Sequence, residues 1–177
     1  MFTFTGIGSI PALKIITPFF AEDERGFFRK NFERDVFLQN GIDFTVNESF
    51  ETLSRKNVIR GLHFQTCNPQ KKLVSCSFGE IFDVAVDMRE DSPTYLKWHG
   101  EILSGVNRKM FYIPDGFAHG FQVLSEKACV GYLCCGVYDK ATDGGIRWND
   151  PTVGVRWKEA DEYIVSDKDS RLNLVNL

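Results

Sequence analysis

The clearest strand signal in this chain is the run EIFDVAVDM, residues 80–88. Its apolar side chains at the even positions of Phe82–Met88 share one face, and Asp83 and Asp87 fall on the other. This alternation predicts a β-strand. The two aspartates face either solvent or a polar cavity, and solvent is the default expectation.

Turn residues punctuate the rest of the chain at intervals that suit short strands. Helix signals are confined to residues 31–39, which end at Asn40-Gly41, and to residues 158–163. Many short strands and few helices predict an all-β fold, either a sandwich, a barrel or a jelly roll. A jelly roll with an interior cavity is the choice that leaves room for a ligand. The length of 177 residues predicts a single domain over residues 1–177.

Composition narrows the class of partner. The net charge of −3 argues against nucleic acid, which usually needs a basic face. Five cysteines, an odd number without a CxxC pair, favour a reducing compartment over a disulfide framework. No apolar run reaches membrane-spanning length and no signal peptide is evident. We therefore expect a cytoplasmic protein that does not bind a membrane.

A histidine lies in a second apolar stretch, VIRGLHFQ, at residues 58–65. Imidazole titrates near neutral pH, so His63 near the cation Arg60 suits a base that takes a proton from an anionic ligand. A packed strand histidine, with Arg60 in solvent, is the alternative. His119 poses the same choice, because it shares a face with Phe117 and Phe121.

Three further segments carry reactive side chains whose direction the spacing does not settle. Lys72 points either into a cavity, where it can stabilise an oxyanion, or into solvent. Tyr132 and Tyr138 share a face if the strand between them is regular, and a phenol can donate a proton to a carbanion. Asp169 belongs either to a solvated terminal charge run or to a carboxylate that folds back onto His63.

A metal centre is disfavoured by the small number of candidate ligands. A divalent ion usually needs about three protein ligands. His63 lacks a His-x-His neighbour, and only His99 and His119 remain. We therefore expect no metal site.

Several motifs follow one another in order over most of the chain. They are DERGFF at residues 23–28, NES at 47–49, RGLHFQ at 60–65, KLV at 72–74, FDVAVD at 82–87, IPDGFAHGF at 113–121 and GIRWNDP at 145–151. In combination this series resembles the dTDP-4-dehydrorhamnose 3,5-epimerase family of the cupin superfamily, from about residue 23 to residue 169. The resemblance implies a cupin-type double-stranded β-helix, or jelly roll. It also implies a homodimer that acts on a nucleotide-diphosphate-linked 4-keto sugar without any cofactor.

The resemblance further implies roles for individual residues. His63 matches the catalytic base and Asp169 the carboxylate that orients it. Tyr132 matches the acid that reprotonates the sugar from the other face, and Lys72 matches the lysine that stabilises the enolate oxygen. Arg25 and Arg60 match the arginines that hold the diphosphate. The implied substrate-binding positions are Arg25, Phe28, Lys30, Asn47, Ser49, Arg60, His119 and Tyr138, and Asp83 is expected to brace His119.

The chain departs from the family where the family reads the thymine base. Lys30 stands there in place of the usual glutamate and Thr45 in place of the usual glutamine. Around Tyr138, Leu133, Val137 and Lys140 also differ from the usual polar, tyrosine and proline positions. These departures support the hypothesis that the nucleotide is GDP rather than dTDP, with a heptose among the candidate sugars. The expected pathway is deoxysugar or heptose biosynthesis for surface polysaccharide.

Other activities and details stay open. A nucleotide-sugar 3,4-ketoisomerase and a catalytically silent sugar-nucleotide-binding module are the alternatives. The sequence does not settle whether C3, C5 or both are inverted.

Overall fold

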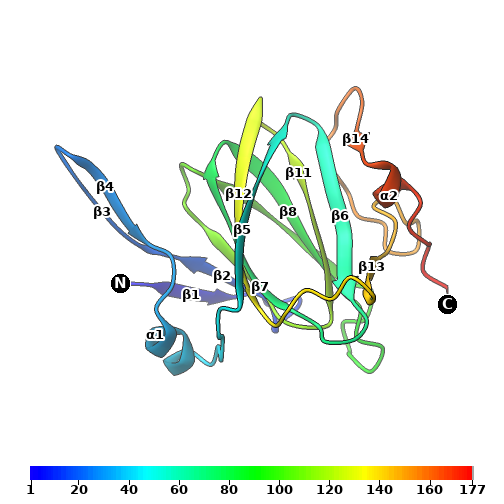
Figure 1. Cartoon of the computed structure of the whole chain (residues 1–177), viewed down its shortest axis with the longest axis horizontal. Coiled ribbons are helices and arrows are strands. Elements are labelled where there is room, and N and C mark those ends of the chain that lie inside the picture. Colours follow the sequence, from blue (N-terminus) through cyan, green and yellow to red (C-terminus); the bar gives the residue numbers. More distant parts are fainter. Residues whose placement is uncertain (177) are drawn as a thin grey trace.

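The computed structural model describes residues 1–176 and contains two sheets that face each other (Figure 1). The first sheet consists, in spatial order, of β1 (Thr3–Gly6), β2 (Lys14–Thr17), β10 (Met110–Ile113), β7 (Lys71–Phe78), β12 (Lys127–Cys135) and β5 (Glu48–Arg55). The second consists of β13 (Asp143–Gly145), β6 (Val58–Gln65), β11 (Phe117–Val123), β8 (Glu80–Asp87) and β9 (Trp98–Ser104), with β14 (Ile164–Val165) parallel to β6. This arrangement confirms the all-β prediction.

A separate hairpin extends from the two sheets. It is formed by β3 (Phe19–Asp23) and β4 (Gly26–Lys30), and it projects away from the body of the molecule (Figure 1). Its tip exposes Phe27 and Phe28, at 67% and 57% of their surface. Exposed phenylalanines on a projecting arm are typical of a surface that another molecule covers.

The main core lies between the facing sheets. Alternate side chains of each strand point inward, so Val74 from β7 and Val130 from β12 meet Ala85 from β8 and Phe121 from β11. Each of these side chains is at least 99% buried. Replacing Phe121 with alanine would cost about 3–5 kcal/mol of unfolding free energy, because the cavity left behind collapses only in part.

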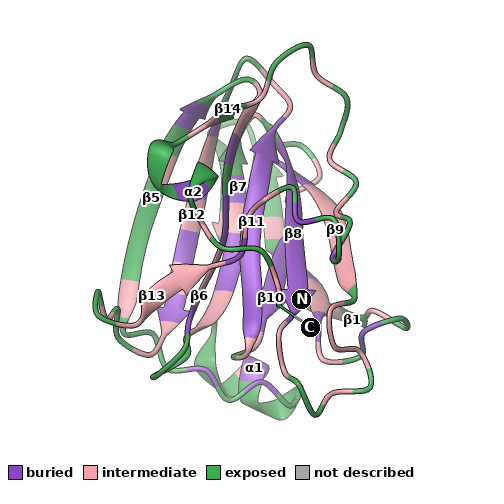
Figure 2. Ribbon diagram, turned by 90° about the vertical axis from the view of Figure 1, so that its right-hand side faces the viewer, coloured by how far each residue is buried: buried purple, intermediate pink, exposed green. Residues whose placement is uncertain are grey.

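Strand β8 is buried along nearly its whole length (Figure 2). The expectation that Asp83 and Asp87 face solvent is wrong, because both side chains are fully buried between the sheets. The reason is that the opposite face of β8 is covered as well, by side chains of the C-terminal segment such as Val153 and Trp157. Burial opposes the charge of Asp87, but hydrogen bonds from Arg89 and from two neighbouring hydroxyls lower its pKa to about 2.

The helices depart from the sequence predictions. Helix α1 (Arg34–Gln39) lies within the segment 31–39 but begins three residues later, because Phe32 packs against Phe37 instead of opening the helix. The helix expected at residues 158–163 is wrong, since both the amide and the carbonyl of Lys158 bond to the side chain of Gln122.

The second helix is instead α2 (Asp167–Ser170), whose N-cap is a serine hydroxyl that accepts from the amide of Asp169. Over residues 1–176, neither helix is long and apolar enough to cross a bilayer.

Candidate active site

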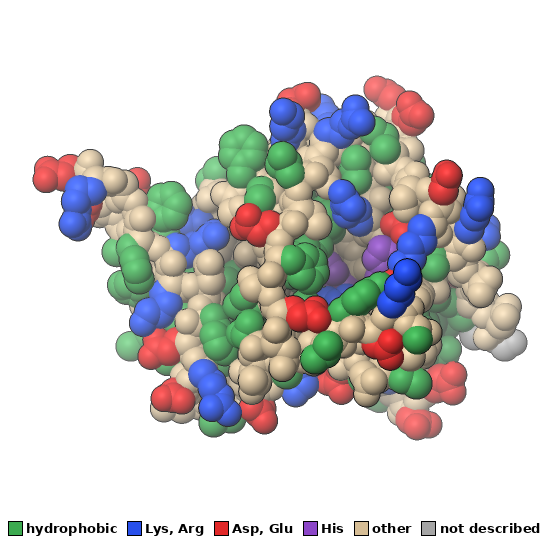
Figure 3. Space-filling view, viewed as in Figure 1, with side chains coloured by type: hydrophobic (Ala, Val, Ile, Leu, Met, Phe, Trp, Pro, Cys, Tyr) green, Lys and Arg blue, Asp and Glu red, His purple; other side chains and the backbone are tan. Residues whose placement is uncertain are grey.

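The facing sheets enclose a cavity of about 640 Å³. Figure 3 shows it as a hollow in the surface with histidine side chains visible inside. This volume lies within the range of small-molecule sites, about 300–1,000 Å³. Seven of the residues that the sequence singled out line it together: Arg60, His63, Lys72, His119, Tyr132, Tyr138 and Asp169.

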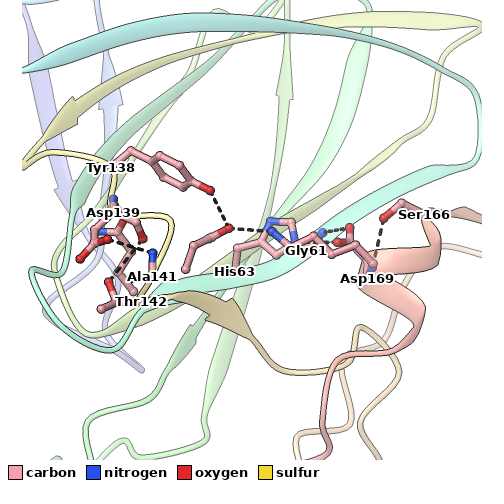
Figure 4. A network of polar contacts seen from close by, with 11 residues as sticks. Gly61, His63, Tyr138, Asp139, Ala141, Thr142, Ser166 and Asp169 are labelled. Atoms are coloured by element: carbon pink, nitrogen blue, oxygen red, sulfur yellow. Dashed lines mark hydrogen bonds and ion pairs between the residues drawn. The ribbon is translucent and has the colours of Figure 1, made fainter.

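His63 of β6 is bonded to a carboxylate from the far end of the chain. Its Nε2 lies 2.8 Å from Oδ1 of Asp169 on α2, and Oδ2 of Asp169 accepts from the amide of Gly61 at 3.1 Å (Figure 4). Burial disfavours the charge of Asp169, but these bonds hold its pKa below the usual value.

The hydrogen bond to Asp169 decides which ring nitrogen of His63 can accept a proton from a ligand. A carboxylate only accepts hydrogen bonds, so Nε2 of His63 carries the proton and Nδ1 can receive another. Within residues 1–176 the imidazole of His63 makes no second hydrogen bond, and 31% of its side chain is exposed. The arrangement is that of an oriented base beside a cavity.

A second histidine–aspartate pair lies on the neighbouring strands. His119 of β11 is directly opposite His63 in the β11–β6 register, and its Nε2 lies 2.8 Å from Oδ1 of Asp83. The His119 side chain is only 4% exposed and that of Asp83 is fully buried. Burial raises the pKa of Asp83, against the influence of His119. This pair therefore fixes the cavity wall in place.

Tyr132 approaches the cavity from the facing sheet. Its ring stacks on Phe50 at 4.6 Å and meets the edge of His119 at 5.8 Å, so the ring is held on two sides. Burial raises the pKa of its phenol well above the usual value. The phenol stays protonated, and its hydroxyl makes no hydrogen bond to any other described residue. Tyr132 can therefore donate a proton to a ligand.

Lys72 supplies a half-buried positive charge. It lies on β7 opposite Cys134 of β12, and burial lowers the pKa of its ammonium group. No carboxylate in residues 1–176 forms an ion pair with it, although it lines the cavity. A half-buried cation without a carboxylate partner is an electrostatic site for a ligand oxygen that becomes negative.

Tyr138 reaches the cavity by a route that differs from the expected one. A regular strand from Tyr132 to Tyr138 is wrong, because β12 ends at Cys135 and Gly136 turns the chain with a φ of +101°. Tyr138 therefore lies in the loop before β13. Its hydroxyl donates to Oδ2 of Asp143 at 3.1 Å.

Several cavity residues were not predicted from the sequence, among them an ion pair between Lys168 and Asp143. Lys168 Nζ lies 2.6 Å from Asp143 Oδ2, and both side chains line the cavity. They are 25 positions apart and each looks like an ordinary surface charge in sequence. The one local signal is that Lys168 precedes Asp169.

The structure leaves five of the expected binding residues outside the cavity wall. Arg25 pairs with Asp23 at the exposed hairpin tip, and Lys30 bonds Glu33 at 2.9 Å. The others serve elsewhere: Phe28 contacts Phe19, Asn47 accepts from the amide of Gly136, and Ser49 lines a smaller groove of about 120 Å³.

Residues 1–176 contain no group of three or more His, Cys, Asp or Glu side chains arranged to hold a metal ion. The fold and the cavity define a jelly-roll protein whose cavity is lined by side chains that can transfer protons.

The chain belongs to the dTDP-4-dehydrorhamnose 3,5-epimerase family, whose sequence profile matches residues 8–176. It is 45% identical over 163 residues to the dTDP-4-dehydrorhamnose 3,5-epimerase of Methanothermobacter thermautotrophicus, which covers 91% of this chain and 88% of that protein. It is 42% identical to the Salmonella typhimurium enzyme of the same name, over 95% of this chain and 93% of that one.

A solved structure is similarly close. The Legionella pneumophila dTDP-6-deoxy-D-glucose-3,5-epimerase, in complex with dTDP-4-keto-L-rhamnose, superposes with a TM-score of 0.95 at 40% identity. The match covers 98% of this chain and 93% of that one. These similarities confirm the cupin jelly roll and place the chain among the isomerases.

Proposed function

We propose that this protein inverts C3 and C5 of a nucleotide-diphosphate-linked 4-keto sugar by deprotonation and opposite-face reprotonation. The observation that carries the proposal is that His63 and Tyr132 line one cavity from facing sheets. A base and an acid on opposite walls are what inversion at carbon requires.

The chemistry follows from the ketone. A carbonyl at C4 acidifies the hydrogens on C3 and C5, since the electrons left behind are delocalised onto oxygen. His63 takes the proton, the C–H electrons form an enolate, and the ammonium of Lys72 stabilises its oxygen. Tyr132 then gives a proton to the other face of the carbon. His63 is left protonated and Tyr132 ionised, and exchange with water restores both.

We further propose that a second copy of the chain completes the substrate site. Arg25 and Phe28 lie on the projecting hairpin, outside the cavity of their own chain. Within that cavity, Arg60 is anchored to Ser54 by its Nε, so its remaining guanidinium donors are free for one side of a diphosphate. A hairpin from a partner chain would supply the second arginine.

Mixed assemblies test this arrangement. Arg25→Ala and His63→Ala chains are each expected to be nearly inactive, whereas a mixture that exchanges subunits regains activity at sites with an intact His63 and a donated Arg25. No recovery in verified mixed dimers would contradict a shared site.

For the nucleotide, dTDP is the first candidate because the relatives reported above are named for dTDP sugars. GDP is the second, and it rests on Lys30 and Thr45. Calorimetric titration with dTDP and GDP separates them. Tight binding of dTDP alone would end the GDP hypothesis.

Solvent deuterium tests the reaction itself. In deuterated water we expect NMR to detect deuterium at C3 and C5 of a dTDP- or GDP-linked 4-keto sugar, with inversion at both centres. A binding module would incorporate none, and a 3,4-ketoisomerase would move the carbonyl.

A further inference from the structure

The segment 136–139, here called the Tyr138 loop, is held mainly by side chains rather than by strand pairing. Asn47 Oδ1 accepts from the amide of Gly136 at 2.8 Å, and Gln70 Nε2 donates to the carbonyl of Gly136 at 3.1 Å. Glu48 Oε1 accepts from the amide of Tyr138 at 2.6 Å. Side chains replace the ladder that ends at β12, so their loss would free the loop.

Gln65 bonds the backbone of this loop at the residues before and after Tyr138. Its Oε1 accepts from the amide of Asp139 at 2.7 Å, and its Nε2 donates to the carbonyl of Val137 at 3.2 Å. Nε2 of Gln65 also donates to the carbonyl of Asn68 at 2.7 Å. A single side-chain carboxamide therefore holds the backbone on both sides of Tyr138 by hydrogen bonds.

Gln65 is nearly buried and lines only a small adjoining pocket of about 30 Å³, beside His63 and Lys72. It is 93% buried, since only 7% of its surface is exposed, and it is absent from the lining of the 640 Å³ cavity. Tyr138 does line that cavity and is half exposed, with its hydroxyl tied to Asp143. Figure 4 shows the Tyr138 ring directed toward the region of His63. The ring is thus anchored at its backbone by Gln65 and at its hydroxyl by Asp143.

We propose that Gln65 is a positioning residue that fixes the Tyr138 ring at the cavity wall and so sets the affinity for the sugar nucleotide. This inference rests on the proposed function. A ring that is already ordered loses less freedom when the ligand binds. Gln65 also shares β6 with His63, so one strand carries both the base and the support of a substrate-contacting ring.

Replacing Gln65 with methionine is the first test. Methionine keeps the length of the side chain and removes all three hydrogen bonds. KM should rise about tenfold, while kcat stays within about threefold and the pH profile of kcat is unchanged. An unchanged KM, or a fall in kcat with KM unchanged, would overturn the proposal.

The chain offers a matched control in Gln122. It is 1% exposed, and its carboxamide also forms two hydrogen bonds with the backbone, at the amide and the carbonyl of Lys158. Gln122→Met should lower the melting temperature to a similar degree and leave KM unchanged. If Gln122→Met raised KM as much as Gln65→Met, the effect would be general destabilisation and the proposal would fail.

Gln65→Glu provides a variant that can be switched by pH. An ionised glutamate can accept from Asp139 but faces the carbonyls of Asn68 and Val137, whereas a protonated one regains a donor. The ratio of its KM to that of the wild type should therefore fall as the pH is lowered. A ratio independent of pH would contradict a role for these hydrogen bonds.

A double-mutant cycle tests whether Gln65 acts through Tyr138. In a Tyr138→Ala background, Gln65→Met should change KM by less than about twofold, because the ring that it positions is gone. Additive effects would overturn the proposal. Wild-type protein run in parallel separates the two levels: failure of the wild type to turn over the dTDP- or GDP-linked 4-keto sugars contradicts the proposed function, whereas normal turnover with an unaffected variant contradicts only the role of Gln65.

Discussion

The two histidine–aspartate pairs of this molecule have the same bond and different surroundings. In each, Nε2 of the histidine lies 2.8 Å from Oδ1 of the aspartate, and the two histidines face each other across neighbouring strands. The His63 side chain is 31% exposed to the cavity, but that of His119 is 4% exposed. Asp169 comes from the distant helix α2, and Asp83 from the adjacent strand β8.

The difference indicates that access to the cavity, rather than the dyad itself, separates a base from a wall residue. His63 can meet a carbon acid and exchange its proton with water. His119 is enclosed by its aspartate and by the ring of Tyr132. We therefore propose that the first pair abstracts the proton and that the second shapes the sugar site.

Substitution of each histidine in turn should reveal the largest difference between the two pairs. His63→Ala should lower deuterium exchange at both C3 and C5 by about 10³-fold or more, because the variant lacks the imidazole that Asp169 orients at the cavity. His119→Asn, which can still bond Asp83, should keep exchange within about tenfold of wild type and raise KM instead. NMR in deuterated water gives both rates, and circular dichroism checks the folds. Equal losses in the two variants would contradict the division of roles.

Substitution of each aspartate in turn should give a smaller difference in the rate of deuterium exchange. Asp169→Asn should slow exchange by about 10²-fold, since an amide neither orients the ring as well nor stabilises the imidazolium. Asp83→Asn should slow it by less than about tenfold and mainly reduce affinity. Single-turnover kinetics separate the two terms. A larger loss of rate in Asp83→Asn would make His119 the better candidate for the base.

The pH dependence of stability sharpens the contrast further, with opposite signs for the two carboxylates. The pKa of Asp169 is lowered in the fold, so its charge contributes stability above the unfolded value of 3.8, and this is lost as pH falls through the folded pKa. The pKa of Asp83 is raised, so stability is gained as pH falls through that raised value.

Urea unfolding from about pH 7 to about pH 3 measures both effects, at about 1.4 kcal/mol per pKa unit. The advantage of wild type over Asp169→Asn should shrink toward low pH. The advantage over Asp83→Asn should grow. A common sign for both variants would contradict these assignments.

Local periodicity predicted the strands but not what covers them. The alternation at residues 80–88 located β8 correctly. It could not reveal that side chains such as Val153 and Trp157 cover the face opposite Asp83, because that contact joins distant segments. The same limit explains the helix wrongly expected at residues 158–163. There the side chain of Gln122, on β11, forms hydrogen bonds with the backbone amide and carbonyl of Lys158.

The site shows a similar division. The direction of Lys72 and the return of Asp169 to His63, across 106 positions, depend on tertiary structure, and residue types alone left both open. The family resemblance supplied the pairing. Neither source indicated the Gln65 contacts, because a glutamine in a strand carries no signal until the loop that it holds is in place.

The most direct test of opposite-wall proton transfer is Tyr132→Phe, assayed in deuterated water with the sugar nucleotide that the wild type turns over. The account predicts that His63 still removes the protons, so deuterium enters C3 and C5, while inversion falls about 10²-fold or more because the acid on the other wall is missing. Inversion at the wild-type rate, or equal loss of exchange and inversion, would contradict it.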